Sequence, residues 1–417
     1  MEIRPLLELM VKRDASDLHL KVGSPPGLRV HGELEPLQEM AKLTDADTAA
    51  LVGQLMTTDG QRANYERNLE TDFSYGIEGL ARFRVNVFHQ RGACGAVLRK
   101  IPYDIPPIES MGFPPVVIEL CHKPRGLVLV TGPTGSGKST TLAAMIDQVN
   151  RTEHGHILTL EDPIEFIHQD KKCFINQREI GQDSRSFAAA LRSALREDPD
   201  VILVGEMRDL ETIGLAITAA ETGHLVFGTL HTTSAVQTID RIIDVFPHEA
   251  QQQVRMQLSV TLQGVISQTL LPKLGGGRTC AQEIMVGTDA VRSLIREGKT
   301  TQLLNVLQTG SQFGMQTLEA HLVKLVQIGH ITPDEACSKA NSPQSVLTLL
   351  GSRNGASPPH AAANGHGHGK EAAIAHPVAE AVPVAAGSAA APKAPVRSSL
   401  SPEDFEKFRQ QRRSDSR

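Results

Sequence analysis

The feature that most constrains the fold of this chain is the glycine-rich run GPTGSGKST, which directly follows the apolar stretch LVLVT. The run matches the pattern GxxxxGK[ST], in which glycines allow successive backbone N–H groups to surround a phosphate. A strand before such a loop and a helix after it favour nucleotide binding, because the helix N-terminus attracts the anion. The sequence therefore predicts an α/β domain with a nucleotide site whose binding residues are Gly132, Pro133, Thr134, Gly135, Ser136, Gly137, Lys138, Ser139 and Thr140.

Two residues of this loop have individual predicted roles. Lys138 is expected to reach the β and γ phosphates of ATP, as the lysine of this pattern does. Ser139 is expected to ligate Mg²⁺ through its hydroxyl group. ATP and Mg²⁺ are therefore the predicted cofactors.

Residues 1–100 show a different pattern, with short alternating runs such as DLHLKV and ARFRVNVFHQ. This alternation is typical of an antiparallel sheet, which we expect to carry one or two helices. In the second run Arg82 and Arg84 alternate with Phe83 and Val85, so the arginines share the face opposite the core. That face is either solvated or reaches the nucleotide of a neighbouring subunit.

The rest of the chain divides by composition. The proline-rich stretch 101–115 disfavours regular structure and predicts an interdomain linker. Within 116–350, apolar runs such as HILTL and LVFGTL are separated by helix-length segments, which is typical of a buried parallel sheet, and helical patterns follow it. Residues 351–417 are rich in Ala, Pro, Gly and His, and we expect them to form a disordered tail.

Composition also limits the partners and the location of the chain. A formal net charge of −5 gives no electrostatic case for nucleic acid. The five cysteines are widely spaced, which excludes zinc knuckles and fits a reducing cytoplasm. No stretch of about 18 apolar residues occurs, so we expect a cytoplasmic protein that contacts a membrane only peripherally.

An acidic cluster, EDPIEF, follows the predicted strand HILTL and contains Glu161, Asp162 and Glu165. Open α/β sheets bind ligands at the carboxyl ends of their strands, which is where these carboxylates lie. They are expected to hold Mg²⁺ through water, or to orient and deprotonate the attacking water. The alternative is a solvated acidic turn.

Two further clusters follow predicted strands. In DPDVILVGEMRD, glycine replaces the aspartate that usually ends a Walker B strand, so metal binding is expected to fall to Glu206. In ETGHLVFGTLHTTSA, His224 and His231 lie seven residues apart and therefore on opposite faces of a strand, which argues against a shared metal. We expect His231 to sense the γ phosphate by hydrogen bonds, with His224 as a second candidate from the start of the strand, while a purely structural role is the alternative.

In this order, the four motifs resemble the Walker A, Asp-box, Walker B and His-box set of the secretion ATPases. Nearly all of residues 1–350 is similar to the pilus retraction ATPases of that superfamily, including the stretches SDLHL, TIDRIIDVFP and DAVRSLIREGK. The glycine in the Walker B motif is shared by the superfamily. By this resemblance, the glycine is not a sign of an inactive enzyme.

The resemblance implies a homohexamer with a PAS-like α+β N-terminal domain and a RecA-like P-loop domain that ends in helices. It implies that Glu165 is the general base and that Glu206 organises metal and water, with Glu161 and Asp162 in the second shell of Mg²⁺. Arg82, Arg84 or Arg91 is the implied arginine finger. An inner-membrane pilus platform protein and an accessory retraction ATPase are the implied partners, at the inner membrane.

The predicted function is thus that of a hexameric Mg²⁺-dependent ATPase motor for type IV pilus retraction and twitching motility. One alternative is a pilus assembly or type II secretion ATPase, but such relatives usually carry a longer N-terminal region and a paired-cysteine zinc insertion. Another is a non-hydrolysing accessory subunit, against which the intact Lys138, Glu165 and Glu206 argue. No role is implied for the tail.

Overall fold

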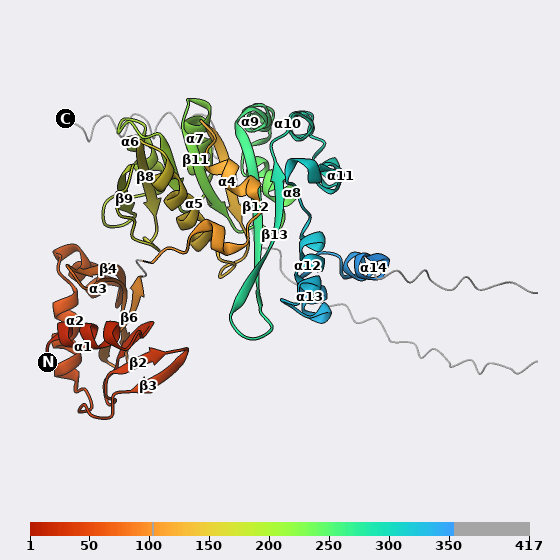
Figure 1. Ribbon diagram of the computed structural model, residues 1–417. Coiled ribbons are helices and arrows are strands. Elements are labelled where there is room, and N and C mark those ends of the chain that lie inside the picture. Colours follow the sequence, from red (N-terminus) through yellow and green to blue (C-terminus); the bar gives the residue numbers. More distant parts are fainter. Residues whose placement is uncertain (102–103, 354–417) are drawn as a thin grey trace, which may run out of the picture. The chain divides into compact units, whose positions relative to one another are not determined.

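The computed structural model describes residues 1–101 and 104–353, which contain two β-sheets with separate hydrophobic cores (Figure 1). We call residues 1–101 the N-terminal lobe and residues 104–353 the C-terminal lobe. The predicted α+β domain followed by an α/β domain with C-terminal helices is confirmed. Most of the predicted disordered tail, 351–417, lies outside the described residues.

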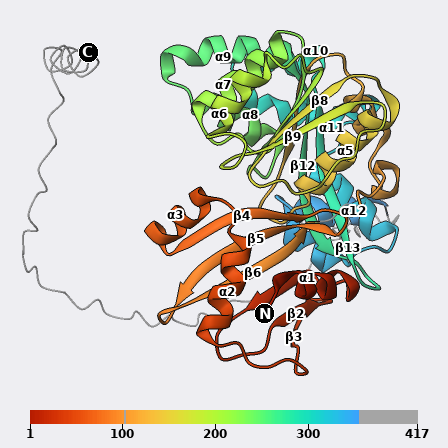
Figure 2. The ribbon, with the colours of Figure 1, turned by 90° about the vertical axis from the view of Figure 1, so that its left-hand side faces the viewer.

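The N-terminal lobe is built on a six-stranded antiparallel sheet in the order β3-β2-β1-β6-β5-β4. Figure 2 shows β4, β5 and β6 side by side, with α3 at the β4 edge. The strands are β1 (Asp17–Leu20), β2 (Gly27–Val30), β3 (Glu33–Pro36), β4 (Glu70–Ile77), β5 (Ala81–Gln90) and β6 (Ala93–Ile101), and the helices are α1 (Ile3–Lys12), α2 (Asp45–Leu55) and α3 (Asp59–Asn68).

The core of this lobe follows the expected alternation along β5. Phe83, Val85 and Val87 are fully buried, whereas Arg82 and Arg84 lie on the other face. Three helices are present where one or two were expected. The sequence pattern missed α3 because none of its residues is buried, so it carries no apolar stripe.

The C-terminal lobe contains a seven-stranded sheet in the order β13-β12-β7-β11-β10-β8-β9, parallel except for β13. β7, β10 and β11 are buried along their whole length, which explains their continuous apolar sequences. The strands are β7 (Gly126–Thr131), β8 (His156–Glu161), β9 (Phe174–Glu179), β10 (Val201–Val204), β11 (Leu225–Leu230), β12 (Leu262–Pro272) and β13 (Arg278–Val286).

Helices cover both faces of this sheet. Residues of α4 and α5 pack on one face, and residues of α6 to α9 pack on the other. The helices are α4 (Pro115–Cys121), α5 (Lys138–Thr152), α6 (Phe187–Ala194), α7 (Leu210–Glu221), α8 (Ala235–Asp244), α9 (His248–Thr261), α10 (Asp289–Arg296), α11 (Leu303–Thr309), α12 (Leu318–Gln327), α13 (Pro333–Lys339) and α14 (Pro343–Arg353), with short 3-10 turns η1 (Ile108–Met111), η2 (Thr300–Gln302) and η3 (Gly310–Phe313).

Helices follow the sheet as the sequence predicted. Residues of α12 to α14 form a small separate core with Leu271 and Ala281 of the β12–β13 hairpin. Within residues 1–101 and 104–353, no helix combines the length and apolarity needed to cross a membrane. β7, β8, β10 and β11 run parallel, so their carboxyl ends meet at one edge of the sheet.

Candidate functional site

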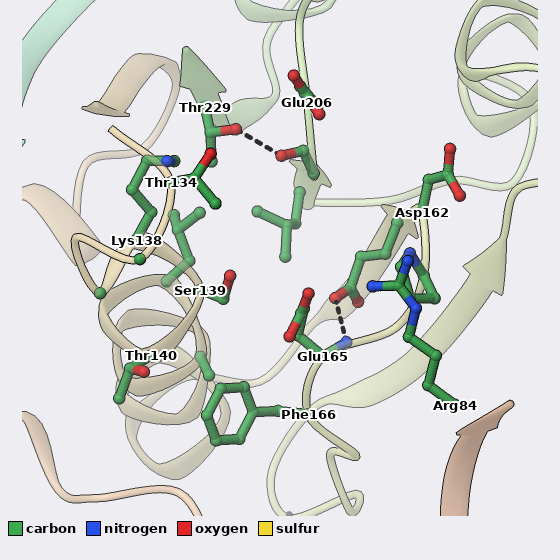
Figure 3. Close-up of a pocket in the computed structure, with 18 of the residues that line it drawn as sticks. Arg84, Thr134, Lys138, Ser139, Thr140, Asp162, Glu165, Phe166, Glu206 and Thr229 are labelled. Atoms are coloured by element: carbon green, nitrogen blue, oxygen red, sulfur yellow. Dashed lines mark hydrogen bonds between the residues drawn. The ribbon is translucent and has the colours of Figure 1, made fainter. Parts of the chain in front are cut away.

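A cavity of about 560 Å³ lies at this edge and is lined by residues from all four predicted motifs. Figure 3 shows the phosphate-binding loop and α5 on one side and the acidic segment after β8 on the other. The predicted residues that line the cavity are Thr134, Gly135, Gly137, Lys138, Ser139, Thr140, Glu161, Asp162, Glu165, Glu206, His231 and Arg84.

The loop needs glycine at two positions for different reasons. A Cβ atom on Gly132 would lie 2.3 Å from the carbonyl oxygen of Gln268, so no side chain fits there. Gly137 has a φ of 93°, in the left-handed region that favours glycine, and it turns the chain into α5. The buried Ser136 Oγ makes no hydrogen bond to any described residue, so the loop retains an unused polar group beside Gly132. These are properties of a phosphate cradle.

Lys138 is folded back onto this loop. Its Nζ donates hydrogen bonds to the carbonyl oxygens of Gly132 (2.8 Å) and Pro133 (3.1 Å). Burial lowers the pKa of Lys138, and the nearby carboxylate of Glu206 opposes this effect. The ammonium group is thus placed between the loop and the acidic side of the cavity.

The glycine at the end of the Walker B strand has a steric cause. A Cβ atom on Gly205 would lie 3.0 Å from the carbonyl oxygen of Leu160 and 3.2 Å from the Cα of Glu161. An aspartate therefore does not fit without moving β8. The next residue, Glu206, lines the cavity and supplies the carboxylate in its place.

Two basic side chains hold Glu206. Its Oε1 accepts hydrogen bonds from Arg208 Nε and from Nε2 of His231, the latter at 2.7 Å. Burial raises the pKa of Glu206, but the hydrogen bonds from Arg208 and His231 outweigh burial and hold this pKa below its ordinary value. Glu206 is therefore ionised at neutral pH, and His231 is oriented by it.

The acidic segment after β8 places two carboxylates in different environments. Glu161 is 8% exposed, and burial raises its pKa to about 7 against hydrogen bonds from Thr159, the Glu165 backbone and Gln177. Glu165 is exposed in the cavity, and its backbone N–H donates to Glu161 Oε2 at 3.2 Å (Figure 3). Glu161 is thus placed to support the segment, while Glu165 is open to a ligand.

The two predicted histidines lie at opposite ends of β11. His231 follows the carboxyl end and lines the cavity. His224 precedes the amino end, where its Nδ1 lies 2.9 Å from the carbonyl oxygen of Ala219 in α7, outside the cavity lining. A six-residue strand spans roughly 20 Å, so His224 lies beside α7 and outside this cavity, and γ-phosphate sensing by His224 stays a prediction.

The three predicted arginines also separate. Arg84 lines the cavity, and Figure 3 shows it near Asp162 and Glu165. Arg82 donates a hydrogen bond of 3.3 Å to the buried carboxylate of Glu179 in its own chain. Arg91 lies in the turn between β5 and β6 with a φ of 53°, away from the cavity lining.

The lining residues that the sequence did not single out include Arg99, Phe166, His168 and Arg278. Arg99 pairs directly with Arg84 across β5 and β6, so only the strand register reveals that the two arginines share a face. Burial lowers the pKa of His168 to about 4, which makes it neutral in this site. Phe166 belongs to the EDPIEF motif, which was the available signal for this residue.

The chain is also similar in sequence to known proteins. Residues 3–312 match the family described as Type II/IV secretion system protein. The chain is 56% identical over 344 residues to the type IV pilus retractation ATPase PilT of Pseudomonas aeruginosa, covering 82% of this chain and 99% of that protein. It is 53% identical over 322 residues to a twitching motility protein of Neisseria gonorrhoeae, covering 77% and 86%.

The fold is also similar to that of a solved structure, the pilus retraction motor PilT with bound ADP. The TM-score is 0.79 at 50% sequence identity, and the match covers 84% of this chain and 99% of that one.

Proposed function

The chain belongs to the Type II/IV secretion system protein family and is an ATP hydrolase, and from this premise we propose that it powers type IV pilus retraction and twitching motility. The observation that carries the proposal is the convergence of Lys138, Glu165 and Glu206 on one cavity. These residues supply the phosphate contact, the base and the metal-organising carboxylate that ATP hydrolysis requires.

The substrate is bound by the chain's own loop and helix. Lys138 and the backbone N–H groups of 132–140 would bind the β and γ phosphates, with the N-terminus of α5 facing them. Ser139 and Glu206 would hold Mg²⁺, which neutralises charge on the phosphate oxygens when bound. Two protein ligands suit this ion, because Mg²⁺ keeps several waters and phosphate oxygens in its shell.

Hydrolysis requires a water aligned with the γ phosphorus. Glu165 would orient this water and accept its proton on a carboxylate oxygen as the bond from the water oxygen to phosphorus forms and the bridging P–O bond to ADP breaks. With its Nε2–H donating to Glu206, His231 would donate a second hydrogen bond to the γ phosphate from Nδ1 when both ring nitrogens carry protons. Asp162 and Glu161 would act through water or through the backbone.

The assembly is proposed to be a homohexamer, in which an N-terminal lobe supplies an arginine to a nucleotide. Arg84 is the first candidate because it lines the cavity. Arg82 is the second candidate, because its guanidinium already donates to Glu179 and is less free to reach a nucleotide. Arg91 remains a candidate only for a neighbour's site. We propose a cytoplasmic location, peripheral at the inner membrane, with a platform protein and an accessory retraction ATPase as partners.

The decisive experiment is steady-state phosphate release with Mg²⁺ and ATP, with the oligomer mass recorded on the same sample. Wild type should be active, and Lys138→Ala and Glu206→Gln should each lower kcat at least about 100-fold. An assembled but inactive wild type would favour the non-hydrolysing accessory role. Gene deletion that abolishes twitching but leaves surface pili supports retraction, whereas loss of the pili would indicate an assembly ATPase.

A further inference from the structure

The segment from Glu165 to Cys173 joins β8 to β9 without forming a helix or strand. Residues 166–168 are half-buried and Cys173 is buried, so backbone N–H and C=O groups at these positions need partners other than water. Two amide side chains supply several of these partners. Gln177 of β9 binds the half nearest Glu165, and Asn150 of α5 binds the other half.

Gln177 holds the backbone immediately after Glu165. Its Nε2 donates to the carbonyl oxygen of Phe166 at 2.9 Å, and its Oε1 accepts from the N–H of His168 at 2.8 Å. The same Nε2 lies 3.3 Å from Glu161 Oε1. Because Glu161 accepts the N–H of Glu165, this glutamate is held on both sides by linked polar groups.

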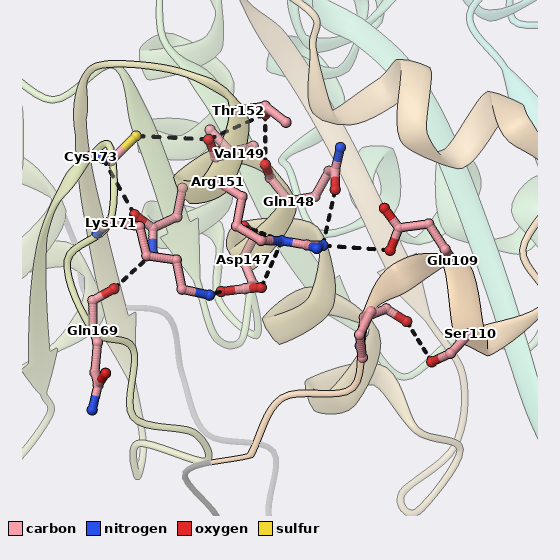
Figure 4. Close-up of polar contacts among 12 residues, drawn as sticks. Glu109, Ser110, Asp147, Gln148, Val149, Arg151, Thr152, Gln169, Lys171 and Cys173 are labelled. Carbon is pink, nitrogen blue, oxygen red and sulfur yellow. Dashed lines mark hydrogen bonds and ion pairs between the residues drawn. The ribbon is translucent and has the colours of Figure 1, made fainter.

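Asn150 holds the distal half in an equivalent way. Its Nδ2 donates to the carbonyl oxygen of Gln169 at 2.8 Å, and its Oδ1 accepts from the N–H groups of Lys171 (3.0 Å) and Cys173 (3.3 Å). Figure 4 shows this half against α5, with an ion pair between Lys171 and Asp147. The distal half is therefore anchored without any help from Gln177.

We propose that Gln177 is a positioning residue for the catalytic base Glu165, an inference that rests on the function proposed above. One amide both donates to and accepts from neighbouring backbone groups, as a paired strand does, and this fixes where the Glu165 side chain begins. Gln177 itself is not among the residues that line the cavity. Its loss should therefore change the rate of the chemical step and leave nucleotide binding intact, because a misplacement of about 1 Å lowers rates on the order of 100-fold.

The test compares two isosteric apolar replacements in the full chain, Gln177→Met and Asn150→Leu. Each removes one amide that binds the same segment, so each should lower the thermal midpoint. Gln177→Met should lower kcat at least about 10-fold, with the Kd for ADP, measured by calorimetry, within about threefold of wild type. Asn150→Leu should keep kcat within about threefold. Equal losses of kcat in both variants, or an unchanged kcat in Gln177→Met, would overturn the proposal.

A double-mutant cycle separates this inference from the assignment of the base. Glu165→Gln should lower kcat at least about 100-fold to a residual rate that single-turnover assays can measure, and adding Gln177→Met should lower that residual rate no further, since both act on one step. If Glu165→Gln keeps wild-type turnover, the base assignment and this inference both fail. If Glu165→Gln is inactive but Gln177→Met has normal kcat, only this inference fails.

A second variant covers the case in which Gln177→Met does not fold. Gln177→Glu keeps the acceptor for the His168 N–H but removes the donor to the Phe166 carbonyl. It should show a lower kcat with an unchanged Kd for ADP. A folded Gln177→Glu with wild-type kcat would overturn the proposal.

Discussion

Replacing Glu161 by glutamine should remove a pH-dependent loss of stability. Burial raises the pKa of Glu161 from 4.5 to about 7 in the folded chain. Below about pH 4.5 the carboxyl group is protonated in both states and has no effect. Between 4.5 and about 7 the folded chain binds more protons at this site than the unfolded chain, so the free energy of unfolding falls as pH rises.

The magnitude follows from the separation of the two pKa values. At about 1.4 kcal/mol for each pH unit between them, the full effect is about 3 kcal/mol and is reached above pH 7. Part of this loss of unfolding free energy is already present at pH 5, because the unfolded carboxyl group is partly ionised there. The expected change in the wild-type contribution between pH 5 and 8.5 is therefore about 2 to 3 kcal/mol.

The assay is urea unfolding of nucleotide-free wild type and Glu161→Gln, followed by circular dichroism at both pH values. Other titrating groups are common to the two proteins, so the difference between their unfolding free energies isolates this carboxyl group. The unfolding free energy of the variant minus that of wild type should rise by about 2 to 3 kcal/mol between pH 5 and pH 8.5. A difference that stays constant, or moves the other way, would refute the reasoning.

Three further perturbations test other features of the C-terminal lobe. Gly132→Ala should weaken ADP binding at least about 10-fold by calorimetry, because residue 132 has a φ of 141° and the new Cβ would lie 2.3 Å from a backbone oxygen. Unchanged affinity would contradict the cradle geometry. Leu129→Ala, at a fully buried position in β7, should lower the free energy of unfolding by about 2 to 5 kcal/mol in urea, and a loss below about 1 kcal/mol would mean the core collapses around the site. Arg292→Ala should speed amide hydrogen exchange at the end of α9, since Arg292 donates to the carbonyl oxygens of Ser259 (3.0 Å) and Gly287 (2.7 Å). Exchange equal to wild type would show that these hydrogen bonds do not hold that end of the helix.

The sequence predicted best what depends on local pattern. Buried central strands such as β7 carry continuous apolar runs, and the loop GPTGSGKST has a fixed relation to the strand and helix beside it. The opposite faces of β5 followed from alternation alone. The carboxyl-end rule for parallel sheets likewise predicts that His231, which follows β11, lies nearer the nucleotide site than His224, which precedes it.

Features that depend on long-range pairing were not predictable. Arg99 joins Arg84 only because the register of β5 and β6 places them opposite each other. Arg278 reaches the cavity from β13, whose antiparallel return cannot be inferred from its own residues. The positions of Gln177 and Asn150 around the segment after β8 likewise emerge only in three dimensions.

The crowding around Gly205 also limits how this sequence can change. Any side chain there meets the backbone of β8, so substitution cannot restore an aspartate without displacing a neighbouring strand. The proposed metal site consequently depends on the carboxylate of Glu206, because position 205 cannot supply a second one. A side chain at position 205 therefore requires β8 to shift by a few tenths of an ångström, which couples any change at this position to the packing of the neighbouring strand.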